Sequence, residues 1–494
     1  MRAQLASLAL LAGSSAAPIA AHEEPTVRNA NHIFNAIHSS MREWGSTLYH
    51  NGMSFFLASV PAGTQLYHGT GNPNPTAGME WLSFELEQAI LFARLPRPPI
   101  EPHNPRRGPA YGQGQEPLSS GPEAGEESGW LHTYAAARDL RLLYIDGLSA
   151  ARSNNGTQDS QKRIFLNDTI HESQIVDEAE AADEMCRILR ETWDDRLDGI
   201  LRMEIGTEII LCSFERDLEF VRAVRAKPIK SLDKGNRSKK KTLADLQPDV
   251  ASWLSVASRY HGIGGNRVRL NYDHFVTAFA HDLDIFGGES KKYRPRLEHL
   301  ESSSLEPIRQ ELETLVMTYD PSEPSFNWQA ITDMIVERYS HTLKYLTSGI
   351  PDEAEVRENI ERLLQPFVEY HRRNITLEAD RCKTQFIPFL APTQGTAALA
   401  VRSVAQEICW ALLEAWEADY KTTMSKITYL VEYLSWTTWK ECTGCKDNEI
   451  CMVPVSPLGA AEDYDHPTCR DVKNPDIPGP RYWGGFYIPS PDAE

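Results

Sequence analysis

The sequence lacks both an excess of basic residues and, after its N-terminus, a long apolar run. No later segment offers about 20 uninterrupted apolar residues, so we expect no transmembrane segment. The chain has 50 Lys and Arg against 69 Asp and Glu, for a net charge of −19. Because a phosphate-binding surface needs clustered basic side chains, this balance argues against nucleic acid as a partner.

Motifs of several enzyme classes are also missing. G-x-S-x-G, H-E-x-x-H and a phosphate-binding loop are absent, which leaves serine hydrolase, zinc protease and nucleoside triphosphatase activities without support. The run HGIGG, residues 261–265, is glycine-rich but is not G-x-G-x-x-G, so it predicts a loop. His274 and His281 are seven residues apart on one expected helical face, whereas metal ligands favour i and i+4. That segment therefore predicts a helix surface and no metal site.

The N-terminus has the pattern of a leader that is removed. Residues 1–21 carry one basic residue, an apolar run and small residues before a plausible cut after Ala21, which predicts a secretory signal peptide and an extracellular protein. Four N-x-S/T sequons suit the same route and predict a glycoprotein: Asn155, Asn167, Asn236 and Asn374.

The eight cysteines are even in number: Cys186, Cys212, Cys382, Cys409, Cys442, Cys445, Cys451 and Cys469. In an oxidising compartment this favours disulfides, whose pairing the sequence does not give. The spacing C-x2-C-x5-C with a fourth Cys eighteen residues on differs from the paired C-x2-C or H-x3-H patterns of zinc knuckles. We therefore expect disulfides here and no metal.

A chain of 494 residues predicts two or three domains. We expect an α+β domain of mixed sheet over residues 29–226, interrupted by a Pro- and Gly-rich disordered insertion at 96–129. A linker at 227–248 carries the basic run Lys239 to Lys241, which predicts a solvated segment. A mostly helical domain, 249–440, and an irregular Cys-rich tail, 441–494, complete the chain.

Periodicity predicts the individual elements. Strands are expected at 54–60, 64–70, 140–147 and 208–214, and helices at 32–45, 84–94, 178–195, 398–420 and 422–439. One more helix is expected after Pro351 and Asp352, which form a start signal, with a kink at Pro366.

Three short motifs of the N-terminal part follow one another in a fixed order. The first is LYHGT, residues 66–70, at the end of an apolar strand. The second is EWLSFELEQAILFAR, residues 80–94, where a strand end leads directly into a helix. The third lies in residues 196–220, where Glu208 opens an apolar strand.

This order resembles the ADP-ribosyltransferase superfamily in its histidine-bearing branch, which includes the poly-ADP-ribose polymerases and diphtheria-type toxins. The resemblance covers roughly residues 55–225. It implies an ADP-ribosyltransferase-like fold and NAD as substrate, with His68 and Glu208 as catalytic residues. The residues implied to bind NAD are His68, Gly69, Thr70, Trp81, Ser83 and Phe84. The arginine-specific branch is disfavoured, because its motif arginine is replaced by His68 and its E-x-E by Gly206-Thr207-Glu208.

The chemistry of NAD cleavage explains why a carboxylate, an imidazole and aromatic rings would be needed at these positions. Breaking the nicotinamide–ribose bond builds positive charge on the ribose, which a carboxylate such as Glu208 stabilises. A neutral His68 can bind a ribose hydroxyl, Trp81 or Phe84 can stack on nicotinamide, and Ser83 can bind its carboxamide. We therefore expect NAD glycohydrolase or ADP-ribosyltransferase activity towards an unknown protein or small-molecule acceptor, with His68, Ser83 and Glu208 lining one cleft. The alternative is an inactive secreted binding or effector protein that uses its helical domain for contacts.

Overall fold

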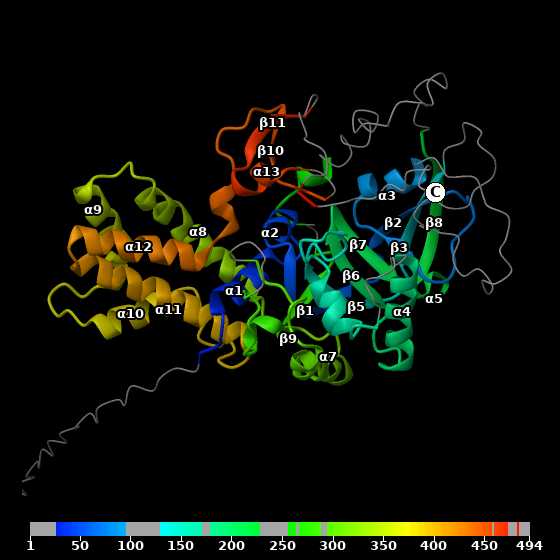
Figure 1. Cartoon of the computed structure of the whole chain (residues 1–494), viewed down its shortest axis with the longest axis horizontal. Helices are drawn as coiled ribbons and strands as arrows, with labels where there is room; N and C mark the ends of the chain where they lie inside the picture. The colour runs from blue at the N-terminus through cyan, green and yellow to red at the C-terminus, as the bar shows by residue number, and fades with distance from the viewer. Residues whose placement is uncertain are drawn as a thin grey trace, which may run out of the picture.

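The computed structural model describes residues 26–94, 129–169, 178–227, 255–262, 266–287, 294–456, 459–472 and 482–483. The N-terminal part is mixed α and β, and the C-terminal part is mostly helical (Figure 1). The signal peptide lies outside the described residues, as do Asn236 and, apart from Gly129 and Lys227, the expected insertion and linker.

A six-stranded mixed sheet forms the centre of the N-terminal part. Its order is β3-β7-β6-β5-β1-β9, with one parallel pair, β5 with β6, among antiparallel neighbours. The bounds are β1 Asn51–Val60, β3 Glu80–Leu82, β5 Leu140–Gly147, β6 Gly199–Glu204, β7 Gly206–Leu211 and β9 Arg269–Thr277. β1 is buried along its whole length, as expected of a strand covered on both faces.

A smaller antiparallel sheet adjoins the first. It contains β2 (Gln65–Thr70), β4 (Trp130–Ala136) and β8 (Leu218–Arg225) in the order β2-β4-β8. The two sheets meet where Tyr67 and Ser83 exchange both backbone hydrogen bonds, each 2.9 Å long. β2 is therefore a neighbour of β3.

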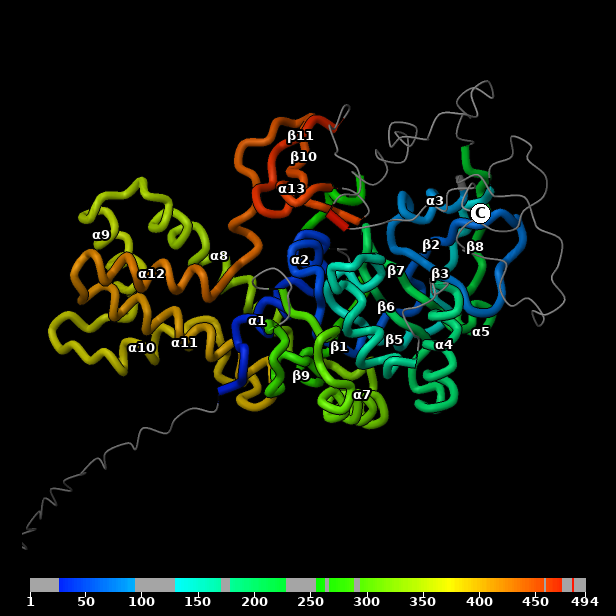
Figure 2. The backbone as a smooth tube through the Cα atoms, viewed as in Figure 1, coloured from blue at the N-terminus to red at the C-terminus, as the bar shows by residue number. Residues whose placement is uncertain are grey.

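The helical part lies beside the large sheet (Figures 1 and 2). Helices of the first half are α1 Ala30–Ser39, α2 Glu43–Leu48, α3 Leu86–Arg94, α4 Glu178–Glu191 and α5 Phe214–Asp217. Those of the second half are α7 Glu306–Thr318, α8 Trp328–Thr347, α9 Glu353–Leu364, α10 Ile375–Thr384, α11 Thr396–Glu417, α12 Tyr420–Leu434 and α13 Ala461–Asp465. Short 3-10 or π turns complete the set: η1 Ser160–Phe165, η3 Ala278–Ala280, η4 Ser302–Leu305, η5 Gln365–Phe367 and η6 Thr437–Lys440.

Most expected strands and helices are confirmed to within a few residues. The single helix expected at 32–45 is instead two helices, α1 and α2, and the helix expected through His274 and His281 is wrong. Residues 269–277 form β9, which pairs with β1 at the edge of the large sheet. His281 follows η3, and its ring bonds Glu311, whereas the ring of His274 stacks on Tyr319. The segment after 249 thus contributes a strand to the N-terminal sheet before the helices begin.

Helix α11 is the centre of the helical part. It packs against α1, α8, α9, α10, α12 and β9. In the described part of the chain, α11 alone is long and apolar enough to cross a membrane, and 56% of its most apolar window is buried inside the protein. Such burial is also typical of the core helix of a globular domain, so α11 does not establish a membrane span.

Helix α9 begins at the expected start signal. The Asp352 side chain accepts the backbone N–H of Glu355 at 2.9 Å, and the Glu355 side chain accepts that of Asp352 at 3.0 Å, which completes a capping box. Pro366 lies in η5, directly after α9 ends.

We expect Asp352→Ala to lower the free energy of unfolding by about 1 kcal/mol, because the first turn of α9 loses its side-chain acceptor. Urea unfolding measures the change. Asp352→Asn is the matched control, since its amide oxygen can still accept the same N–H. An equal loss in both variants would show that the carboxylate charge and not the cap stabilises this end.

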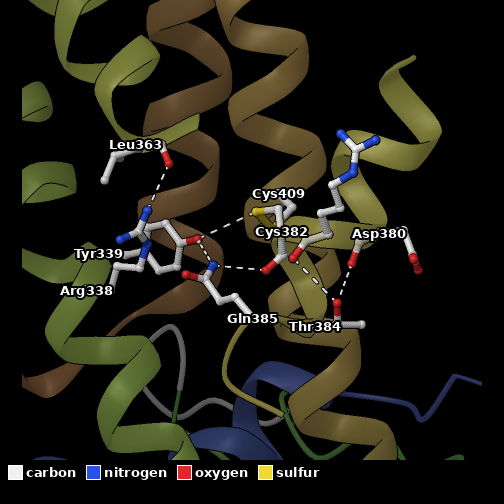
Figure 3. The surroundings of a disulfide bond; sticks show 9 residues. Arg338, Tyr339, Leu363, Asp380, Cys382, Thr384, Gln385 and Cys409 are labelled. Carbon is white, nitrogen blue, oxygen red and sulfur yellow. Dashed lines mark hydrogen bonds between the residues drawn. A yellow bond between two sulfur atoms is a disulfide. The ribbon is translucent and has the colours of Figure 1, made fainter. Parts of the chain in front are cut away.

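All eight cysteines are paired, as expected for an oxidising compartment. The bonds are Cys186–Cys212, Cys382–Cys409, Cys442–Cys451 and Cys445–Cys469. Figure 3 shows the second of these, which joins α10 to α11 beside Tyr339. The Tyr339 hydroxyl lies 3.6 Å from Cys382 Sγ and accepts a hydrogen bond from Gln385.

The Cys-rich tail is more regular than expected and packs on the N-terminal part (Figure 2). Strands β10 (Glu449–Met452) and β11 (Thr468–Asp471) form an antiparallel pair. Ile450, Met452 and Val453 share a buried apolar cluster with Trp44 of α2 and Tyr260. The tail therefore covers the outer side of α2.

Candidate functional site

The fold brings the three sequence motifs side by side. β2 carries the first, β3 and α3 the second, and β7 the third. Tyr67 pairs with Ser83, and Trp81 pairs with Ile210, so the strands lie in the order β2, β3, β7. Backbone hydrogen bonds alone place β2, β3 and β7 next to one another, whatever the roles of their side chains.

A pocket of about 170 Å³ lies where these segments meet. Each motif contributes to it: Tyr67 from β2, Phe84 and Glu85 from the turn into α3, and Gly206 from β7. The rest of its wall is formed by Met41, Glu43, Leu86, Glu87, Met203, Val256, Arg259, Gly262 and Arg267. Phe84 is the residue of the expected site that lines this pocket.

Glu43, the first residue of α2, is an uncharged acid in this pocket at neutral pH. Its side chain is buried and accepts hydrogen bonds from the Gly206 amide at 2.9 Å and from the Thr47 hydroxyl at 3.3 Å. Burial is the main cause that raises the pKa of Glu43 to about 8; the nearby Glu85 and Glu204 side chains add to the rise, and the hydrogen bonds from Gly206 and Thr47 oppose it. Glu43 therefore carries a proton that it can donate.

Glu85 is held differently. Its Oε2 accepts hydrogen bonds from the Thr207 amide at 2.9 Å, the Thr207 hydroxyl at 2.5 Å and the Ser83 hydroxyl at 3.0 Å. All three end on Oε2, so a molecule in the pocket would meet the carboxylate through its other oxygen.

Gly206 fixes the spacing between the two acids. Its φ is +86°, and a Cβ at this position would lie 3.0 Å from both Glu85 Oε2 and Gln88 Oε1. Only glycine adopts this conformation without strain and lets its amide reach Glu43. The pocket thus places two buried, hydrogen-bonded glutamate side chains on the two sides of one glycine.

A second, open hollow of about 320 Å³ adjoins the pocket through Tyr67 and Arg267, which line both. Its other residues are Pro61, Thr64, Gln65, Asn266 and Arg269. The Arg267 guanidinium donates to the Phe84 carbonyl at 3.1 Å and lies 5.2 Å from the centre of the Phe84 ring. The hollow therefore places two guanidinium groups next to an acidic pocket, although the chain as a whole is acidic.

His68 lies on the other face of β2 from Tyr67, because successive side chains of a strand alternate. It is fully buried, and its Nδ1 bonds the Trp81 carbonyl at 2.7 Å. Burial lowers the pKa of His68 to about 3, so the ring is neutral, and its Nε2 has no hydrogen-bond partner among the described residues. The rings of His132 and Phe214 pack around it.

Glu208 also lies away from the pocket. It follows Thr207 on β7, so its side chain points to the opposite face from the Thr207 hydroxyl that bonds Glu85. There it pairs with Arg202, a fully buried residue that also bonds Glu178 and Gln161. Burial, opposed by Arg202, raises the pKa of Glu208.

The other expected NAD-binding residues are mostly structural in this conformation. Trp81 and Thr70 are buried, and a Cβ on Gly69 would lie 2.0 Å from the Ala89 carbonyl, so Gly69 permits close packing of β2 on α3. Ser83 bonds Glu85 and Gln88 and supports the pocket from behind. In this structure Ser83 bonds the pocket residue Glu85, whereas His68 is enclosed by aromatic rings and Glu208 pairs with Arg202. The roles expected of these three residues stay a prediction.

Glu43 and Glu85 were not among the residues expected from the sequence. Glu85 directly follows Phe84 and belongs to the second motif, so an acidic residue between two apolar ones was a readable signal. Glu43 lies far from every motif in the sequence, and only the packing of α2 against the start of β7 places it here.

Of the described sequons, Asn167 and Asn374 are exposed, whereas the Asn155 amide donates to the Tyr482 carbonyl at 2.6 Å. Glycosylation stays a prediction.

The part of the chain that contains all three motifs resembles a defined family. A family model described as the YPL277C N-terminal domain matches residues 23–127 and 101–234. No solved structure matches the chain.

Two proteins of Saccharomyces cerevisiae (strain ATCC 204508 / S288c) are similar in sequence. "Uncharacterized protein YPL277C" is 36% identical over 208 residues, covering 38% of this chain and 41% of that protein. "Uncharacterized protein YOR389W" is 34% identical over 204 residues, covering 38% of this chain and 32% of that protein. The similarity thus spans less than half of the length of each relative.

Proposed function

We propose that the N-terminal part binds NAD and cleaves the bond between nicotinamide and ribose, with transfer of ADP-ribose to an acceptor or to water. The observation that carries the proposal is the pair of buried glutamates, Glu43 and Glu85, in a pocket built from all three motif segments. The order of those motifs and their adjacency in the fold support an ADP-ribosyltransferase-like assignment.

Glu85 is the residue we assign to the reacting sugar. The ribose gains positive charge as nicotinamide leaves, and a carboxylate fixed beforehand by Thr207 and Ser83 stabilises that charge without reorganising. Nicotinamide departs as a neutral base, so this step needs no proton donor. The protonated Glu43 would instead donate a hydrogen bond to the carboxamide oxygen, and Phe84 and Tyr67 offer aromatic faces to the ring.

The second hollow would hold the rest of the dinucleotide. Arg267 and Arg269 supply the positive charge that a pyrophosphate requires. The pocket of about 170 Å³ is smaller than the roughly 300–1,000 Å³ of most small-molecule sites, but the two adjoining hollows together fall within that range. A molecule with a cationic ring at one end and phosphates in the middle matches this charge distribution.

The buried His68 favours the alternative, a protein that binds a ligand but does not cleave it. In this conformation no substrate reaches the imidazole, because aromatic rings and the Trp81 carbonyl enclose it. A secretory route is part of either proposal and rests on the N-terminal leader pattern, the sequons and the paired cysteines.

Nicotinamide release from NAD tests the proposal. We expect release by the wild type and a loss of about 10²-fold in kcat/KM for Glu85→Gln, because the amide cannot stabilise the developing cation. The matched control is Glu358→Gln, on the exposed face of α9, where Glu358 pairs with Arg362; it should remain active.

The other outcomes separate function from site. No release by the wild type, with NAD binding detected by calorimetry, would favour the binding-only alternative. Neither binding nor release would contradict the proposed function. A further outcome is that Glu85→Gln retains nicotinamide release while Glu208→Gln or His68→Ala loses it. That result would assign catalysis to the residues expected from the sequence.

A further inference from the structure

The tail contains a cluster of four cysteines outside the proposed NAD pocket. The Sγ atoms of Cys442, Cys445 and Cys469 all lie within 4.8 Å of one another. Cys451 is bonded to Cys442 and stands directly opposite Cys469 in the β10–β11 ladder. The two disulfides therefore lie next to each other, with three sulfurs in mutual proximity and the fourth, that of Cys451, joined to one of them.

We propose that these four cysteines bind one zinc ion when their two disulfides are reduced. Zinc favours four thiolates in a tetrahedron with Zn–S distances of about 2.3 Å, which places the sulfurs about 3.8 Å apart. Three of the sulfurs already lie within 4.8 Å of one another. Reduction would free the two sulfurs of each bonded pair to separate to this spacing around one metal ion.

The local backbone suits a metal knuckle as well as a crosslink. Within Cys442-Thr443-Gly444-Cys445, Gly444 has φ +79°, and no atom lies within 4 Å of a Cβ added there. The Cys442 amide donates to Cys451 Sγ at 3.1 Å, and an amide–sulfur bond of this kind stabilises a thiolate ligand. Lys446 and Arg470 directly follow two of the ligands, and in this structure they pair with Glu449 and Asp463.

The tail disulfides are also the accessible ones. All four tail cysteines are partly exposed, whereas each of the other two disulfides contains a buried cysteine: Cys186, whose partner Cys212 is partly exposed, and both Cys382 and Cys409. A reductant therefore reaches the tail first. The metal would then replace the crosslinks and keep Ile450 and Met452 packed on α2.

The reaction balances with an external reductant such as a phosphine. Each disulfide takes two electrons from one phosphine, and water supplies the oxygen of the phosphine oxide and the two protons of the new thiols. Binding of one Zn²⁺ by four thiols then forms four Zn–S bonds and releases four protons.

The test uses the full chain, reduced under native conditions with tris(2-carboxyethyl)phosphine. Thiol titration should find four reactive thiols. The reduced protein should bind one Zn²⁺ per chain, and Co²⁺ in its place should give the visible absorption of a tetrahedral tetrathiolate. Cys445→Ser/Cys469→Ser should lose this binding, whereas Cys382→Ala/Cys409→Ala should retain it.

A reduced wild type with four free tail thiols and no stoichiometric metal would overturn the proposal. So would a Co²⁺ spectrum without thiolate bands, or equal uptake by the Cys445→Ser/Cys469→Ser variant. The Co²⁺ spectrum is recorded on the unmodified chain, so the test does not depend on the folding of a variant. The outcome is also independent of any activity towards NAD.

Discussion

Replacing Arg202 by Met is expected to lower the free energy of unfolding at pH 7 by about 3–5 kcal/mol. The guanidinium is fully buried and bonds Glu208 and Glu178, with Gln161 at 2.8 Å. Met fills a similar volume but leaves two buried carboxylates without their shared cation. Arg202 and Arg152 hold the pKa of Glu178 below its ordinary value although burial opposes them, so this group is ionised and its charge would be poorly compensated.

Urea unfolding at several pH values measures this effect. The loss should shrink at acidic pH, where Glu178 and Glu208 of the variant take up protons, and Arg202→Met/Glu208→Gln should recover part of it by removing one of the two carboxylates. Arg187→Met is the control, because Arg187 lies on the exposed face of α4 with Glu184 and Glu191 and should have no measurable effect. A similar stability of wild type and Arg202→Met would mean that the cluster is hydrated in solution.

Part of the N-terminal architecture was predicted, because β1, β2, β5 and β7 are short apolar runs with turn residues on either side, whereas β4 and β8 were not predicted. β9 was not predicted, since the spacing of His274 and His281 suggested a helix. Tyr272, Phe275, Val276 and Thr277 are strand-forming residues, and they were the better guide. The pairing of eight cysteines could not be read at all, because the sequence permits roughly a hundred combinations.

The site was less predictable than the fold, for reasons that follow from strand geometry. Thr207 and Glu208 are equally polar neighbours on β7, and the sequence does not say which of the two faces a cavity. The same holds for Tyr67 and His68 on β2. On β2 it is Tyr67, a residue without an expected role, that lines the pocket. On β7 it is Thr207 that donates a hydrogen bond to the pocket residue Glu85.

The presence of Glu43 of α2 in the pocket could not be predicted from the sequence for a different reason. Glu43 precedes Trp44 and Leu48, which are buried by Tyr260 and by the tail strand β10. Segments that are hundreds of residues apart thus fix the helix that presents the acid. No local pattern records a contact of this kind, so a tertiary structure was needed to find the second glutamate.

The pH dependence of folding should reveal the proton on Glu43. Its pKa is about 8 in the folded chain and about 4.5 when unfolded. Between these values the unfolded chain has released a proton that the folded chain keeps, so the contribution of Glu43 is fully present below pH 4.5 and is lost as pH rises towards 8. A Glu43→Gln variant escapes this loss, because its amide is neutral at every pH and its oxygen can still accept the Gly206 N–H.

We therefore expect wild type and Glu43→Gln to differ little in unfolding free energy at pH 4, and the variant to be more stable by about 3–5 kcal/mol near pH 8.5. Other buried acids, such as Glu204 with a pKa of about 8, titrate in both proteins and largely cancel in the difference. Glu358→Gln, on the exposed face of α9, should give a flat difference. A flat curve for Glu43→Gln as well would mean that Glu43 is ionised in the folded chain; the pocket would then hold two carboxylates, and Glu43 could not donate a hydrogen bond to a carboxamide.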